Sequence, residues 1–336
     1  MKRLLFLLCL PGCAGPGLRE ETIVVPGTRT RIEMVYVSGD ARLRPFWIST
    51  REVTWGDFNR FYEYPEEQRV DGVTRPSSGK NYLQLSGLPA EQMEEERPVT
   101  NLRYHSAVAY CEWLSRKTGM AFRLPTEAEW QARPAPSPVW QYCFEPERPP
   151  DFGPVLLGAG RRTIPAAWDD ADPNRPVSTW WFRAGHSQGF RLVRLADSGS
   201  AEERARDATR IAISGLQGRE RTVKVGGSVA LFSRVSGEVT NGGDRAIDEL
   251  VLKVYVLDRK GKPHLEDVTS TLTRRATFNV CAPVLRNSAH PGGHVPALRP
   301  GERRRFEVDI PMSMDSDEDV DLEKFGASVL HLQFAE

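Results

Sequence analysis

The spacing of hydrophobic positions differs between the first two thirds of the chain and the last third. Residues 23–25, 32–37 and 46–48 are rich in β-branched and aromatic side chains and predict three short strands. The stretch from 64 to 98 is rich in Pro, Gly, Ser and Glu and predicts a long loop. The first part of the chain is therefore expected to combine short strands and helices with irregular segments.

Three helices are predicted in the same part of the chain. The first begins at Thr54, whose hydroxyl can cap a run of aromatic residues at helical spacing. The second carries its apolar residues on one face and ends at Gly119, which is typical of a C-cap. The third begins with a capping box formed by Thr126 and Glu129, and the prolines from Pro134 onward keep it short.

The last third of the chain has strand-like alternation and no helical period. Residues 228–240, 250–257 and 306–310 predict strands joined by turns, a pattern typical of an all-β sandwich. The charged segment 197–207 is suited to a domain boundary. The acidic stretch 314–323 is most simply a solvated loop. Weak Ca²⁺ binding is the alternative there, although the ligand spacing of a recognised calcium loop is absent.

Length and composition favour a globular protein of two domains. The chain has 336 residues, of which 40% are hydrophobic, and this is enough to bury at least one sizeable core. Its formal net charge is zero. The overall charge balance therefore gives no reason to expect nucleic acid or an anionic membrane surface as a partner.

The N-terminus has the features of an export signal. Lys2 and Arg3 form a basic region, and residues 4–10 form an apolar region too short to span a bilayer. Cys13 stands where a bacterial lipoprotein is lipidated, with ordinary secretion as the alternative. No other stretch resembles a transmembrane helix. We therefore expect an exported protein, either periplasmic or held at the membrane only through a lipid on Cys13.

Three cysteines and two histidines are the remaining candidates for special chemistry. Cys111 and Cys143 are expected to be buried free thiols, with a disulfide between them as the alternative in an oxidising compartment. Cys281 leaves the number of cysteines in the folded part odd. His290 and His294 lie within ligand reach of each other in sequence, but the Pro-Gly-Gly run between them indicates a loop. No metal site is predicted.

Four short segments carry a family resemblance, in order along the chain. They lie at 46–55, 97–114, 123–130 and 189–193, and they resemble the formylglycine-generating enzyme family, also called sulfatase-modifying factors. The motif residues, to which we assign a structural role, are Arg123, Leu124, Pro125, Thr126, Glu127, Glu129, Trp130, Gly189, Phe190 and Arg191. The resemblance implies an irregular domain of the C-type-lectin-like class. The C-terminal segment more faintly resembles small extracellular β-sandwich modules.

The resemblance covers the family's fold but not its chemistry. Enzymes of this family use a late cysteine pair that binds Cu(I), and they oxidise a substrate cysteine to formylglycine with O₂. This chain has no cysteine between Arg161 and Arg191, and only residues 131–138 stand where members carry a segment with calcium-binding positions. Neither copper nor calcium is supported as a cofactor, and no catalytic residue is assigned. Trp180 and Trp181 are candidates for an exposed ligand surface, with burial in the core as the alternative.

The combined expectation is an α+β protein of two domains. Residues 1–13 form the signal, 22–195 a domain like the formylglycine-generating enzyme, 196–207 a linker, and 208–336 an all-β, Ig-like sandwich. The expected function is a non-catalytic binding or assembly protein at the cell envelope. Its partner would be an envelope protein, a peptide or a glycan, and not nucleic acid. The alternative is a protein-modifying oxidase that generates formylglycine on sulfatases through other residues.

Overall fold

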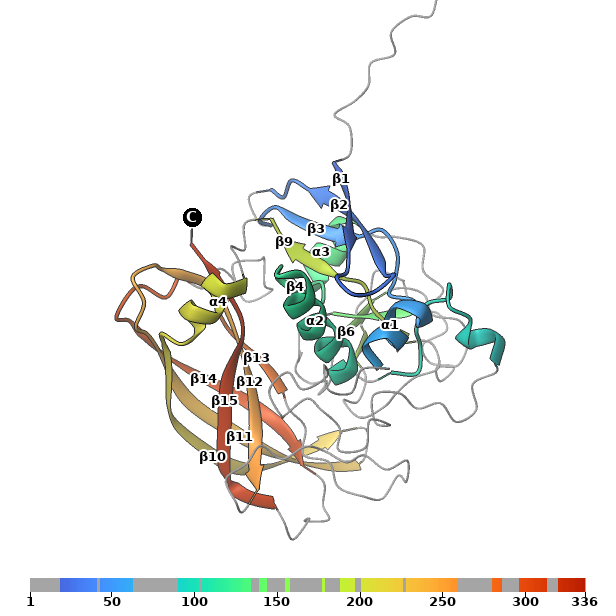
Figure 1. Cartoon of the computed structure of the whole chain (residues 1–336). Coiled ribbons are helices and arrows are strands. Elements are labelled where there is room, and N and C mark those ends of the chain that lie inside the picture. The colour runs from blue at the N-terminus through green and yellow to red at the C-terminus, as the bar shows by residue number, and fades with distance from the viewer. Residues whose placement is uncertain are drawn as a thin grey trace, which may run out of the picture.

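The chain is arranged as two adjoining halves, as the computed structural model in Figure 1 shows. The residues described are 19–40, 43–62, 90–102, 104–133, 139–143, 155–157, 177–178, 188–196, 201–225, 228–258, 280–285, 296–312 and 320–335. Over these residues the fold is mixed, mostly β-sheet with a few helices. This agrees with the predicted combination of strands and helices.

The first half contains an antiparallel sheet of five strands in the order β1-β2-β3-β9-β4. Its strands are β1 (Glu20–Val24), β2 (Arg31–Val37), β3 (Phe46–Ser49), β9 (Val193–Leu195) and β4 (Phe122–Arg123). The three strands predicted near the N-terminus are confirmed. Strand β9 pairs with both β3 and β4, so it brings the segment at 189–193 beside the segment at 123–130.

A smaller sheet of four short strands lies in the same half, in the order β7-β6-β5-β8. Its strands are β5 (Trp140–Tyr142), β6 (Val155–Leu157), β7 (Val177–Ser178) and β8 (Gln188–Gly189). Strands β5 and β8 are parallel, whereas β5–β6 and β6–β7 are antiparallel. The parallel pair places Gly189 opposite Gln141.

The three predicted helices of this half are present, with the predicted start of α1, end of α2 and start of α3, and a 3₁₀ helix, η1, lies in the segment that had been expected to be a loop. They are α1 (Trp55–Tyr62), the 3₁₀ helix η1 (Ala90–Met93), α2 (Tyr104–Thr118) and α3 (Glu127–Ala132). Before α1, the Thr54 hydroxyl accepts a hydrogen bond from the Asp57 amide at 3.3 Å. Helix α2 stops at Gly119, whose φ of 73° lies in the region that glycine adopts most readily. The capping box of Thr126 and Glu129 is present at α3.

An aromatic cluster holds α1 against α2. The ring of Phe58 stacks on that of Tyr110 with 5.7 Å between centroids, and Phe61 meets Trp113 at 5.8 Å. Phe190 packs edge-on against Tyr110 at 5.5 Å. All five rings are fully buried. Such pairs stabilise beyond their buried area, so Phe190 anchors the start of the 189–193 segment on both helices.

The second half consists of two antiparallel three-stranded sheets, ordered β10-β11-β14 and β13-β12-β15. The strands are β10 (Ile211–Val225), β11 (Ser228–Asn241), β12 (Ile247–Asp258), β13 (Val280–Leu285), β14 (Arg303–Met312) and β15 (Val320–Phe334). Strand β10 lies against β15, and β13 against β14. The three predicted strands are confirmed in β11, β12 and β14. The remaining strands, β10, β13 and β15, had not been predicted from the sequence.

Two expectations about irregular segments change. The acidic stretch at 314–323 was expected to be a loop, but β15 begins within it, at Val320. Val320 and Asp321 pair with the end of β12, and a neighbouring strand supplies backbone hydrogen bonds whatever the side-chain charge. The segment expected to link the domains contains α4 (Ala201–Ala208). Of the long loop expected at 64–98, only residues from 90 onward are described.

The two halves share one hydrophobic core. A single cluster of buried residues runs from the aromatic side chains of α1 and α2 into the apolar side chains of β11, β12, β14 and β15. Polar contacts also join the halves: Arg44 forms an ion pair with Asp248 and donates a hydrogen bond to the Phe334 carbonyl at 2.7 Å. Among the residues described, no helix is long and apolar enough to cross a membrane.

Candidate functional site

The central polar group of the molecule is Arg123, which is 4% exposed. Its two terminal nitrogens donate to both carboxylate oxygens of Glu129, at 2.6 and 2.7 Å. The same guanidinium donates to the Leu124 carbonyl at 3.0 Å, and its Nε lies 3.6 Å from a carboxylate oxygen of Glu249 in β12. Arg123 therefore joins the family-like half to the C-terminal half.

Glu129 is held in its charged form although it is buried. Burial alone would raise the pKa of this carboxyl, but the charge and hydrogen bonds of Arg123 outweigh burial, and the pKa is lowered. The amide of Thr126 also donates to Glu129, at 2.7 Å. The carboxylate therefore forms the ion pair with Arg123 and also caps the start of α3, so its role is structural.

Arg191, the last residue of the Gly-Phe-Arg motif, ties three segments together. It is 1% exposed, and it donates twice to the Ser49 carbonyl, at 3.0 and 2.5 Å, and once to the Arg133 carbonyl at 2.9 Å. Burial lowers the pKa of this guanidinium to about 10, and the nearby charge of Glu52 opposes the shift. Arg191 therefore joins β3 to the end of α3.

A third buried chain of hydrogen bonds starts at Trp130. Its indole N–H donates to the Gln141 side chain at 2.8 Å, and the Gln141 amide donates to Glu52 at 2.9 Å. Gln141 is fully buried, so both of its side-chain dipoles are used inside the protein. Gly189 completes this corner, because a Cβ there would lie 2.9 Å from the Val99 carbonyl oxygen.

The remaining motif residues are also placed as parts of the fold. Leu124 and Phe190 are fully buried and Pro125 is buried, while Glu127 is half-buried and accepts a hydrogen bond from Gln131 at 3.1 Å. Positions 123–130 and 189–191 therefore meet around β4, β9 and α3. The candidates Cys13, Trp180 and Trp181 lie outside the described residues, as do His290 and His294.

Two cysteines have described side chains. Cys111, on α2, and Cys143, after β5, are both buried and form no disulfide with each other, which agrees with the prediction of buried thiols. Within the described ranges, no group of three or more His, Cys, Asp or Glu side chains is arranged to hold a metal ion.

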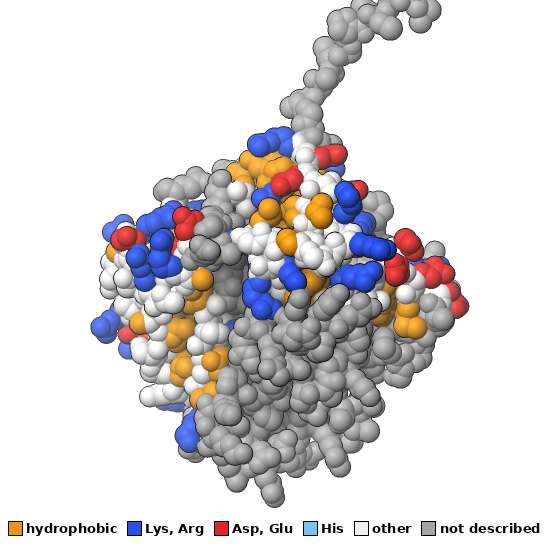
Figure 2. Space-filling model, in the orientation of Figure 1, with side chains coloured by type: hydrophobic (Ala, Val, Ile, Leu, Met, Phe, Trp, Pro, Cys, Tyr) orange, Lys and Arg blue, Asp and Glu red, His pale blue; other side chains and the backbone are white. Residues whose placement is uncertain are grey.

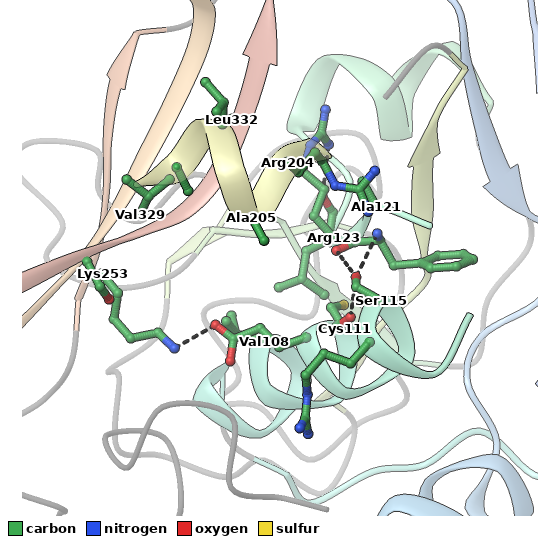
Figure 3. A pocket seen from close by; sticks show the side chains of 16 residues that line it. Val108, Cys111, Ser115, Ala121, Arg123, Arg204, Ala205, Lys253, Val329 and Leu332 are labelled. Carbon is green, nitrogen blue, oxygen red and sulfur yellow. Dashed lines mark hydrogen bonds and ion pairs between the residues drawn. The ribbon is translucent and has the colours of Figure 1, made fainter. Parts of the chain in front are cut away.

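A pocket lies where the two halves meet, and Figure 3 shows its lining. Its volume is about 400 Å³, and it is bounded by α2 and β4 on one side, by α4, and by β12 and β15 on the other. The lining residues are Val108, Cys111, Glu112, Ser115, Arg116, Ala121, Phe122, Arg123, Leu124, Arg204, Ala205, Ala208, Lys253, Ser328, Val329 and Leu332.

No sequence pattern had predicted that the pocket residues would form a site together. Lys253, in β12, is almost completely buried and donates to Glu112 of α2 across the boundary, at 2.5 Å. Arg204 of α4 donates to the Gly119 carbonyl at 3.3 Å. The one feature of the sequence that pointed to this region was Lys253, a charged residue within a largely hydrophobic strand.

A second hollow, of about 320 Å³, lies beside α1 and η1. It is lined by arginines and carboxylates in similar number, including Arg29, Arg60, Glu95 and Glu96. Arg51 and Asp57 also line this hollow, and Arg51 donates a hydrogen bond to Asp57 at 2.7 Å. Figure 2 shows the acidic side chains around η1 next to basic ones, so this surface has mixed charge.

Comparison with known proteins identifies part of the chain. Residues 16–135 match the family model described as "Sulfatase-modifying factor enzyme 1-like domain". No curated protein matches the chain. Among solved structures, Treponema denticola variable protein 1 is similar at 15% identity, covering 52% of this chain and 98% of that chain, with a TM-score of 0.36. A score at that level is too low to support any statement about function.

Proposed function

Residues 16–135 match the sulfatase-modifying factor family, and from this match we propose that the protein is a non-catalytic binding or assembly protein of the cell envelope. The observation that carries the proposal is the internal use of the motif's polar side chains. Arg123, Glu129 and Arg191 are buried and hydrogen-bonded within the fold. Their hydrogen bonds position segments of the chain relative to one another.

The sequence supports the same proposal because it lacks the residues that the family's oxidation chemistry needs. The oxidases of this family need a late pair of thiolates for Cu(I), and the stretch from 161 to 191 contains no cysteine. Cys111 and Cys143 are buried on different elements, α2 and the segment after β5, and neither lies in the late region where the family's enzymes carry their thiolate pair. The resemblance therefore describes ancestry and fold rather than activity.

The architecture of the C-terminal half is compatible with a role in binding or assembly. Its two antiparallel sheets bury Val235 and Val239 of β11 together with Leu250 and Val254 of β12. We propose that this half is an Ig-like sandwich. Because its core continues into the family-like half, the two would present their surfaces in a fixed relation.

The envelope location rests on the N-terminal sequence. The basic and apolar regions up to residue 10 support export, and Cys13 supports a lipid anchor. Cells given radiolabelled palmitate should label the wild-type protein and fail to label Cys13→Ala. Labelling that survives the substitution would contradict the anchor.

Binding is tested by retention of envelope components on the immobilised mature protein and on a glycan array. Trp180 and Trp181 are the proposed ligand-stacking residues, so the double variant Trp180→Ala/Trp181→Ala should lose the retained component. The matched control is Arg97→Ala, which changes an exposed ion pair on the same half. Equal retention by all three proteins would exclude the tryptophans, and no retention by the wild type would contradict the proposal.

A further inference from the structure

The pocket between the halves has the volume of a small-molecule site. Ligand pockets have volumes of about 300–1,000 Å³ and occur preferentially at domain interfaces. This one is about 400 Å³, and its walls come from both halves. A cavity of about 150 Å³ holds benzene, so on the same scale this pocket has room for roughly fifteen non-hydrogen atoms.

More than half of the lining residues are hydrophobic, and they belong to both halves. In Figure 3, Val108 on α2 and Val329 and Leu332 on β15 border the space from different halves. Phe122 and Leu124, in and after β4, extend the apolar wall of the first half. An apolar surface offers water few hydrogen bonds, so replacing water there by hydrocarbon is favourable.

The buried charges of the lining are balanced by partners within the protein. Lys253 is 2% exposed and donates to a carboxylate oxygen of Glu112 at 2.5 Å. Arg123 is paired with Glu129 and lies close to Glu249. A buried charge is stable when it is paired, and these groups already have their counterions. They therefore give no reason to expect a charge on a ligand.

Other polar groups of the lining are also engaged in the fold. The Ser115 hydroxyl donates to the Cys111 carbonyl at 2.7 Å and accepts from the Phe122 amide at 2.9 Å. Arg204 donates to the Gly119 carbonyl at 3.3 Å, and Arg116 is exposed, so water can hydrate its charge. A charged ligand would lose its hydration on entering this apolar space, and that loss disfavours binding.

We propose that this pocket binds a small uncharged molecule that is mainly apolar, held between α2 and β4 of the first half and β15 of the second. Ala205 of α4 lines the pocket and is also exposed, which places α4 at the edge through which the ligand enters. Burial of hydrocarbon against both halves supplies the affinity. The site is separate from the proposed envelope-binding surface and does not depend on it.

Calorimetric titration of the full mature protein with three probes of equal chain length tests the class of ligand: octanol, octanoate and octylamine. Octanol should bind, and both charged probes should bind at least about tenfold more weakly, because each loses the hydration of its charge. Absence of octanol binding would overturn the proposal. Affinity of either charged probe equal to that of octanol would overturn it as well.

Two substitutions of the same kind locate the site. Ala205→Trp places a large side chain in the lining from an exposed position of α4, and it should abolish octanol binding. The matched control is Ala212→Trp, an exposed position of β10 that does not line the pocket, and this variant should bind octanol as the wild type does. Circular dichroism checks that both variants are folded. Unchanged octanol binding in Ala205→Trp would place the binding site elsewhere and contradict the proposal.

Because both halves wall the pocket, its occupation should stabilise both of them. Octanol at about ten times its dissociation constant should raise the midpoint of urea unfolding in the wild type and in Ala212→Trp, but not in Ala205→Trp. An equal rise in all three proteins would show that octanol acts outside the pocket, and the proposal would then be wrong.

Discussion

At the scale of single residues, the charged side chains of the family motifs make contacts within the fold, in keeping with the structural role predicted for them. A buried charge is tolerated only when it is paired and hydrogen-bonded. Arg123 meets this condition through Glu129 and Glu249. Arg191 is hydrogen-bonded to two backbone carbonyls, and the opposite charge near it is that of Glu52. The sequence indicated that Arg123 and the glutamates would form charge-assisted hydrogen bonds. It did not indicate Glu249, because that partner lies in the other half of the chain.

Replacing Arg123 should be strongly destabilising. Arg123→Ala leaves the carboxylates of Glu129 and Glu249 buried without their cation, and this is expected to lower the free energy of unfolding by about 3–5 kcal/mol. Urea denaturation followed by circular dichroism measures the change. Arg97→Ala, which breaks an exposed pair with Glu94, should cost about 0–1 kcal/mol. A similar small loss in both variants would show that the buried network contributes little.

The same network predicts a pH dependence of stability. The pKa of Glu129 is lower in the folded protein than in the unfolded chain, where a glutamate titrates near about 4.3. Its contribution is therefore complete above the unfolded value and is lost as pH falls through the folded one. The difference in the free energy of unfolding between wild type and Glu129→Gln should shrink steadily below about pH 4. A difference that stays constant down to pH 3 would contradict this.

At the scale of elements, local signals were sufficient where an element is specified by its own sequence. Thr54, Gly119 and the pair Thr126–Glu129 marked helix ends that the structure has at those positions. In strand β12, local sequence signals do not indicate that both faces of the strand are buried. Its alternation identifies one buried face, but Glu249, Val251 and Lys253 on the opposite face are buried too, against the first half. Which segment covers a strand depends on tertiary packing, and alternation carries no information about it.

The capping box makes a prediction at this scale. Thr126→Ala removes the hydroxyl that accepts the Glu129 amide at 3.2 Å, and it should lower the free energy of unfolding by about 1 kcal/mol. Thr126→Ser keeps the hydroxyl and should restore most of that loss. Thermal unfolding of the three proteins distinguishes them. Equal melting temperatures for the Ala and Ser variants would show that the hydroxyl is not the stabilising group.

At the scale of the whole molecule, the boundary between the halves is a packed interface. The segment 196–207 was predicted to be a linker, but it contains most of α4, which contributes to the lining of the pocket. The pocket residues come from segments far apart in the sequence, so no local motif could reveal them. The shared core and the pair Lys253–Glu112 give the two halves a common stability.

Common stability predicts a single unfolding transition. All eight tryptophans lie at or before Trp181, so tryptophan fluorescence reports only on the first half. Far-ultraviolet circular dichroism also reports on the long strands of the second half. The two signals should change at the same urea concentration, as expected for one cooperative unit. Two separate midpoints would show that the halves fold independently.

The central proposal for the whole molecule is that it combines a domain like that of the sulfatase-modifying factors, matched over residues 16–135, with the absence of the family's oxidation chemistry. Co-expression with a peptide carrying a sulfatase modification motif tests this directly, with the peptide cysteine read by mass spectrometry. A catalytically active family member expressed in parallel shows that the peptide can be converted. We predict that the cysteine keeps its thiol in the presence of this protein. Clear conversion of the cysteine to formylglycine would contradict the account.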